Sequence, residues 1–133
     1  MKYKKINKVL LVDDNEASNN YNKRLILSLD LADQVSAVLN GQKAFDYIEL
    51  CDVTNLPNVI ILDINMPVTD GFEFLKLYDS LEDLKKKNIV IVMLTTSSNP
   101  IDRLKTDDME NVAHVFNKPL LKDNLIGLWE KFF

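Results

Sequence analysis

The run Val9-Leu10-Leu11-Val12-Asp13-Asp14 joins four apolar residues directly to two carboxylates, and it is the clearest indication of the fold. An apolar run followed by a polar residue recurs in Val59-Ile60-Ile61-Leu62-Asp63. It recurs again in Ile89-Val90-Ile91-Val92-Met93-Leu94, which Thr95 follows. These runs are rich in β-branched residues and do not alternate with polar ones, which is typical of strands covered on both faces in a parallel sheet. Weaker strand patterns over residues 35–39 and 112–116 bring the expected number of strands to five.

Helical periodicity fills the intervals between these strands. Apolar residues recur every three or four positions, and Asn15 is well placed to cap the first helix. The expected apolar stripes are Ala17, Tyr21, Leu25 and Leu29; Ala44, Ile48 and Cys51; Phe74, Leu77, Tyr78 and Leu81; and Leu125, Leu128, Trp129 and Phe132. A further helix is expected between Pro100 and Met109, where the pattern is least regular. Strand and helix therefore alternate five times, which predicts an α/β fold of the (βα)5 type, a three-layer sandwich around a five-stranded parallel sheet.

Length and composition restrict the class of protein. The 133 residues suit one domain, so we expect a single domain over residues 1–133. The net charge of −4 disfavours binding to nucleic acid or to anionic membranes. No apolar run approaches the roughly 18 residues that a membrane span needs. Cys51 is the single cysteine, and a lone cysteine fits a reducing compartment, so we expect a cytoplasmic protein.

Polar residues stand at the carboxyl ends of the predicted strands, where open parallel sheets bind their ligands. They are Asp13 and Asp14, Asp63, the segment Thr95-Thr96-Ser97 and the segment Asn117-Lys118-Pro119. Each is commonplace alone, but three carboxylates packed together are costly unless a cation compensates. An all-oxygen set without cysteine or histidine suits Mg²⁺, which commonly meets substrate phosphate. The pattern of oxygen ligands therefore favours magnesium-dependent phosphoryl chemistry. The three glycines are not clustered, so no glycine-rich phosphate loop is expected.

These residues resemble the receiver domain of the bacterial two-component response regulators, a CheY-like family, along almost the whole chain. The matching motifs are Val12-Asp13-Asp14-Asn15, Leu62-Asp63-Ile64-Asn65-Met66-Pro67 with Asp70-Gly71, Leu94-Thr95-Thr96-Ser97, and Asn117-Lys118-Pro119. Each motif is short, but their order and their positions at successive strand ends make the joint resemblance strong. The resemblance implies the flavodoxin-like strand order 2-1-3-4-5 that is known for this family.

The resemblance also implies a phosphoacceptor and a metal site. Asp63 would be the phosphoacceptor, a carboxylate nucleophile that becomes an aspartyl phosphate. Asp14 and Asp63 would ligate Mg²⁺ directly, together with the backbone carbonyl of Asn65. Asp13 would hold the ion mainly through water.

Two further residues would contact the transferred group by the same resemblance. Lys118 would supply a positive charge to the phosphoryl oxygens, and its peptide bond to Pro119 is cis in the family. Thr95 would donate its hydroxyl to a phosphoryl oxygen and move inward once that oxygen is present. We assign this role to Thr95 rather than Thr96 because Thr95 directly follows Leu94, as in the family pattern.

The family signals by closing the threonine and its loop over the phosphoryl group, which changes a protein-binding surface. An aromatic residue three positions before the lysine usually moves with the threonine. Here that position is Val115, and Phe116 is next to it. Either Phe116 substitutes through a local shift, or the coupling runs mainly through the backbone and the loop.

The sequence therefore predicts a stand-alone response regulator receiver without an output domain. It would accept a phosphoryl group from a histidine kinase or a histidine phosphotransfer protein, and would catalyse only its own phosphorylation and dephosphorylation. Its output would be contact with a downstream protein, or onward transfer as a phosphorelay intermediate. A docking module that is not phosphorylated is an alternative. A phosphatase of the haloacid dehalogenase type is a remote one, because such enzymes want an aspartate where this chain has Asn65. The sequence does not indicate the kinase, the target, the phosphoryl lifetime or the oligomeric state.

Overall fold

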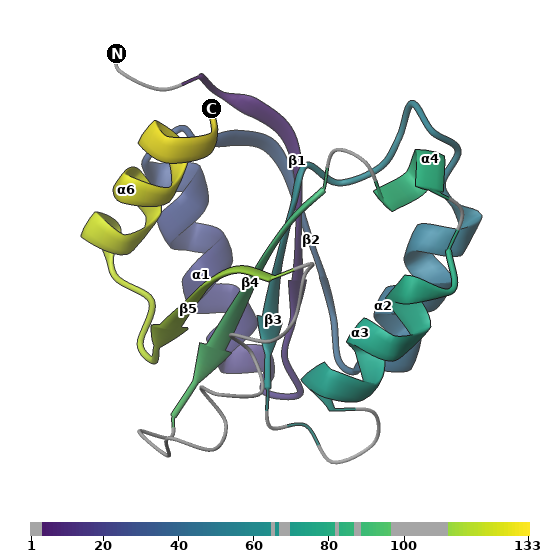
Figure 1. Ribbon diagram of the computed structural model, residues 1–133. Coiled ribbons are helices and arrows are strands. Elements are labelled where there is room, and N and C mark those ends of the chain that lie inside the picture. The colour runs from purple at the N-terminus through teal and green to yellow at the C-terminus, as the bar shows by residue number, and fades with distance from the viewer. Residues whose placement is uncertain (1–3, 65, 67–69, 82, 87–88, 97–111) are drawn as a thin grey trace.

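Five parallel strands form one sheet in the order β2-β1-β3-β4-β5 (Figure 1). The computed structural model describes residues 4–64, 66, 70–81, 83–86, 89–96 and 112–133. The strands are β1 (Ile6–Val12), β2 (Ala32–Val38), β3 (Val59–Asp63), β4 (Val90–Thr95) and β5 (Val112–Asn117). The predicted flavodoxin-like strand order is confirmed.

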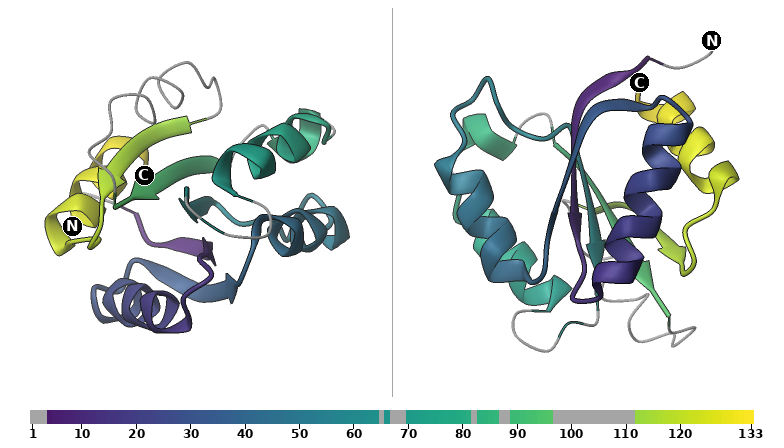
Figure 2. Two further views of the ribbon diagram at one scale, coloured as in Figure 1. Left: turned by 90° about the horizontal axis from the view of Figure 1, so that it is seen from below. Right: turned by 180° about the vertical axis from the view of Figure 1, so that it is seen from behind.

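Helices cover both faces of this sheet and complete the three layers (Figure 2). One face carries α1 (Glu16–Ser28) and α6 (Lys122–Phe132). The other face carries α2 (Gly41–Leu50), α3 (Gly71–Asp79) and the short α4 (Asp83–Lys86). The helix expected between Pro100 and Met109 lies outside the described residues.

The central strands are apolar on both sides because each side faces a helical layer. All five residues of β3 are buried. Alternate residues of β1 enter different cores: Val9 and Leu11 pack with the residues of α1 and α6, whereas Leu10 and Val12 pack with those of α2 and α3. Successive side chains of a strand point to opposite faces, so one apolar run serves two cores.

The apolar stripe predicted for the first helix is wrong in part. Ala17 is exposed and Tyr21 is 48% exposed, whereas the buried positions of α1 are Asn19, Asn22 and Ile26. The beginning of this helix packs beside the carboxyl ends of the strands. Asn19 donates to two backbone carbonyls there, which an apolar side chain could not do. The predicted cap is confirmed, since Asn15 accepts a hydrogen bond from the Ser18 amide at 3.1 Å.

Two smaller differences concern the ends of elements. The second strand begins at Ala32, three residues before the predicted start at Val35, and ends at Val38. The last helix buries Leu125, Leu128 and Trp129 as expected, but Phe132 is 37% exposed because the helix ends there.

Candidate functional site

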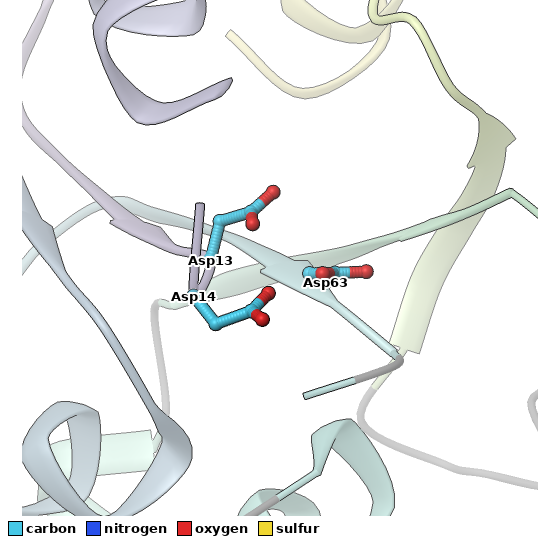
Figure 3. Close-up of side chains that lie close together, drawn as sticks. All are labelled: Asp13, Asp14 and Asp63. Atoms are coloured by element: carbon cyan, nitrogen blue, oxygen red, sulfur yellow. The ribbon is translucent and has the colours of Figure 1, made fainter. Parts of the chain in front are cut away.

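Three carboxylates meet at the carboxyl edge of the sheet, as the sequence predicts (Figure 3). Asp13 and Asp14 directly follow β1, and Asp63 is the last residue of the adjacent strand β3. One oxygen of each lies within 4.8 Å of the others. Asp13 and Asp63 are 3% and 4% exposed, whereas Asp14 is exposed. This mutual proximity follows from the pairing of the two strands in parallel, with Val12 beside Leu62.

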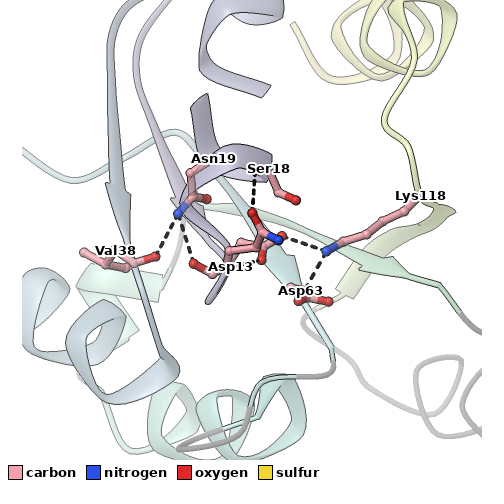
Figure 4. Close-up of polar contacts among 7 residues, drawn as sticks. Asp13, Ser18, Asn19, Val38, Asp63 and Lys118 are labelled. Carbon is pink, nitrogen blue, oxygen red and sulfur yellow. Dashed lines mark hydrogen bonds and ion pairs between the residues drawn. The ribbon is translucent and has the colours of Figure 1, made fainter. Parts of the chain in front are cut away.

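Lys118 places its amine between two of these carboxylates (Figure 4). Its Nζ lies 2.7 Å from Oδ2 of Asp13 and 3.3 Å from Oδ2 of Asp63. Burial alone would lower the pKa of Lys118, but the hydrogen bond to Asp13 and the charge of Asp63 outweigh it and raise the pKa. The amine is therefore charged at neutral pH. Among the described residues, one amine and three carboxylates meet here, which leaves an excess of negative charge that a cation would offset.

The segment after β5 brings Lys118 to this position. The peptide bond between Lys118 and Pro119 is cis, as the family resemblance implies. The Lys118 amide donates a 2.8 Å hydrogen bond to the carbonyl of Thr95, which ties the end of β5 to the end of β4. Thr95 is fully buried at the same edge of the sheet, and Thr96 is exposed. Asn65, expected to supply a backbone carbonyl, lies outside the described residues.

Every polar atom of Asp13 has a hydrogen-bond partner. Its amide donates to the Val38 carbonyl at 3.2 Å, and its own carbonyl accepts from Nδ2 of Asn19 at 3.0 Å. Its Oδ1 accepts from the Asn15 amide at 2.9 Å, and its Oδ2 accepts from Lys118. Asp13 is thus held in one position, whereas no described residue forms a hydrogen bond or ion pair with the exposed carboxylate of Asp14.

Two residues support the site in ways that the sequence did not predict. Asn19 contacts the backbone of Asp13, and only its spacing of four residues after the helix cap gives a faint signal. Gly71 begins α3 against the end of β3, where a Cβ would lie 3.1 Å from the Asp63 carbonyl oxygen and 3.0 Å from Cα of Ile64. The sequence places Gly71 in a family motif, and the structure shows that a side chain there would crowd the backbone at the end of β3.

The sequence model of one family, the response regulator receiver domain, matches residues 9–129. This protein belongs to that family. The receiver is similar to a probable methanogenesis regulatory protein, FilR2, of Methanothrix harundinacea. The two are 31% identical over 119 residues, which are 88% of this chain and 75% of that protein.

Two other similarities show how widely this unit occurs. A two-component response regulator from Cytophaga hutchinsonii has a solved structure that is 29% identical, with a TM-score of 0.89 over 97% of this chain and 98% of that one. Stress response regulator protein 1 of Lodderomyces elongisporus is 29% identical over 113 residues, which are 85% of this chain and 29% of that protein. The family is a signalling module that occurs both in short proteins and as part of long ones.

A cavity of about 440 Å³ opens beside the receiver's acidic cluster. Lys118 lines it together with Tyr21, Leu94 and Pro119, so it lies between the beginning of α1 and the segment that follows β5. Among the residues that the structure describes, no helix combines the length and the apolarity that crossing a bilayer requires.

Proposed function

We propose that this receiver accepts a phosphoryl group on Asp63 in a Mg²⁺-dependent reaction and signals by a change in its protein-binding surface. The observation that carries the proposal is the arrangement of charges around Asp63. This buried carboxylate lies beside two others and within 3.3 Å of the Lys118 amine, at the edge of the sheet where ligands bind.

The donor set fits Mg²⁺. All three side chains offer carboxylate oxygens, which are the ligands that hard divalent cations prefer. Asp14 is exposed, which leaves room for the waters that Mg²⁺ usually keeps. Asp14 and Asp63 would ligate the ion directly with the Asn65 carbonyl, and Asp13 would act mainly through water. When bound, the ion neutralises charge on the phosphoryl oxygens, so that a carboxylate can approach them.

The residues of the chain then have separate tasks. An oxygen of Asp63 forms a bond to phosphorus, while the bond from phosphorus to the nitrogen of a donor histidine breaks and its electron pair stays on that nitrogen. Lys118, charged and held at the site by Asp13, pairs with the phosphoryl oxygens as they arrive. The Thr95 hydroxyl donates to one of these oxygens, and its inward movement favours the signalling conformation.

The donor is a histidine kinase or a histidine phosphotransfer protein. We expect the donor side chain to approach from the α1 side of the site, where Lys118 lines the cavity. The recipient of the signal is a downstream protein, reached either by direct binding or by onward transfer in a phosphorelay. The receiver would catalyse only the gain and loss of its own phosphoryl group.

The test is the intact mass of the protein after incubation with Mg²⁺ and acetyl phosphate. The wild-type chain should gain one phosphoryl group, and Asp63→Asn should gain none. Asp46→Asn is the matched control, because Asp46 is an exposed aspartate of α2 away from the strand ends, and it should behave as wild type.

A chain that gains no phosphoryl group would contradict the proposal if it also fails to bind beryllofluoride in the presence of Mg²⁺. That pair of results would favour a docking module that is not phosphorylated. Binding of beryllofluoride without a stable adduct would instead indicate an aspartyl phosphate that hydrolyses before it can be detected.

A further inference from the structure

Asn19 is a buried amide whose side chain donates hydrogen bonds at the carboxyl edge of the sheet. It is 4% exposed, near the beginning of α1. Its Nδ2 donates to the backbone carbonyl of Asp13 at 3.0 Å and to that of Val38 at 3.4 Å (Figure 4). One helical side chain thus joins the ends of β1 and β2.

The neighbours of this amide fix its orientation, and that orientation leaves one buried acceptor without a hydrogen-bond partner among the described residues. Both groups that face Nδ2 are carbonyl oxygens, and only an N–H donor can face them. The opposite atom, Oδ1 of Asn19, is buried without a hydrogen-bond partner among the described residues. A buried acceptor left unpaired is unfavourable, so a side chain selected for packing alone would not be an amide.

The carbonyl that Asn19 holds belongs to the peptide group between Asp13 and Asp14. A peptide group is planar, so fixing its oxygen also fixes the direction in which the chain enters Asp14. The Asp13 amide donates to the same Val38 carbonyl that Asn19 contacts, which anchors the other side of Asp13. Asp14 itself is exposed, and no side chain in the described part of the structure holds its carboxylate. Its placement therefore depends on this peptide group.

We infer that Asn19 is a positioning residue, which orients the Asp13–Asp14 peptide so that both carboxylates face one cation. The inference rests on the proposed function in taking that cation to be Mg²⁺. Asn19 does not touch the cation or the phosphoryl group. It acts through the backbone, as the outer-shell partners of metal ligands generally do, and their loss typically weakens metal binding by about 10- to 100-fold.

The test compares the Mg²⁺ dissociation constants of Asn19→Leu and Asn22→Leu by isothermal titration calorimetry of the whole chain. Asn22 is the matched control because it lies on the same helix and is 5% exposed. Within the described residues it makes no hydrogen bond to Asp13 or Val38. Asn19→Leu should bind Mg²⁺ about tenfold more weakly than wild type, and Asn22→Leu should bind it as wild type does.

Equal affinities for Mg²⁺ in wild type and Asn19→Leu would overturn the inference. Equal weakening in both variants would overturn it too, because a general loosening of α1 would then explain the result. Should leucine prevent folding at position 19, Asn19→Ala and Asn22→Ala form a second matched pair with the same expected difference. A wild-type chain that binds Mg²⁺ but neither gains a phosphoryl group nor binds beryllofluoride would remove the proposed function, while the affinities would still decide the role of Asn19.

Discussion

Two aspartates that are adjacent in the sequence have opposite surroundings in the structure. Asp13 is buried and every one of its polar atoms is partnered, whereas Asp14 is exposed. A cation at this site therefore meets one carboxylate that is already in place and one that can adjust to it. It would also share the oxygens of Asp13 and Asp63 with the amine of Lys118, so we expect metal binding to change the position of this lysine.

The buried phenol of Tyr78 should make the stability of the receiver fall with increasing pH in the alkaline range. Burial, with a smaller contribution from the charge of Asp79, raises the pKa of Tyr78 from 10.0 to about 12. The unfolded chain loses this proton near pH 10, before the folded protein does. The free energy of unfolding therefore keeps its full value below pH 10. Between pH 10 and 12 it falls by about 2–3 kcal/mol through this group.

Urea unfolding between pH 8 and pH 12, followed by the fluorescence of the buried Trp129, measures this loss. Tyr78→Phe should begin about 1 kcal/mol less stable, because it lacks the hydroxyl that donates to the Lys86 carbonyl at 3.3 Å. Its stability should then fall less steeply with pH than that of wild type. Tyr21→Phe, at an exposed ring, should keep the wild-type slope. If the stability of Tyr78→Phe and of wild type fell in parallel with pH, the loss could not be assigned to Tyr78.

At the scale of elements, the beginning of α3 is packed directly against the end of the strand that carries Asp63. The Gly71 amide donates to the Ile64 carbonyl at 3.0 Å. A Cβ at Gly71 would lie 2.8 Å from Cε of Met93, which can move, and 3.0–3.1 Å from backbone atoms of Asp63 and Ile64, which cannot move without the strand end. Gly71→Ala should therefore destabilise the protein by about 1–3 kcal/mol through overpacking, measured by urea unfolding.

The receiver contains its own control for this substitution. Gly127 lies inside α6, where an added Cβ meets no atom within 4 Å. Gly127→Ala should stabilise the protein by about 1 kcal/mol, because alanine favours a helix interior over glycine. Destabilisation by both substitutions would show that the close contact at Gly71 is not the cause of its effect.

Strand β5 answers a question that the sequence left open. Val115 packs into the core beneath α2 and α3, whereas Phe116 packs on the opposite side and its ring lies 4.4 Å from that of His114. Neighbouring residues of a strand point to opposite faces, so Phe116 cannot replace an aromatic residue at position 115 without a change of register. Of the two routes that the sequence allowed, this favours coupling of the site to the surface through the backbone and the loop.

The sequence could predict the parts of the molecule that depend on local pattern. The central strands were predictable because burial on both faces leaves an unbroken apolar run, and the strand ends then located Asp13, Asp63 and Lys118 at one edge. The buried face of α1 was not predictable. The side chain of Asn19 donates to carbonyls at the ends of two different strands, and no periodicity along the helix records that.

At the scale of the whole molecule, the acidic cluster should make the stability of the receiver depend on Mg²⁺. A ligand that binds only the folded state stabilises it in proportion to the logarithm of its concentration, by about 2.7 kcal/mol at 100 times its dissociation constant. Urea unfolding with and without saturating Mg²⁺ measures this gain. Asp14→Asn should lose most of it, since Asp14 is one of the three carboxylates that face the site.

The same variant separates metal binding from folding. In the absence of Mg²⁺, Asp14→Asn should be at least as stable as wild type, because Asp14 is exposed and its removal relieves repulsion from Asp13 and Asp63. Asp46→Asn should keep the full gain with Mg²⁺. If Asp14→Asn gained as much from Mg²⁺ as wild type, the ion would be stabilising the protein elsewhere. The charge excess at the strand ends would then have to be balanced by Lys118 alone.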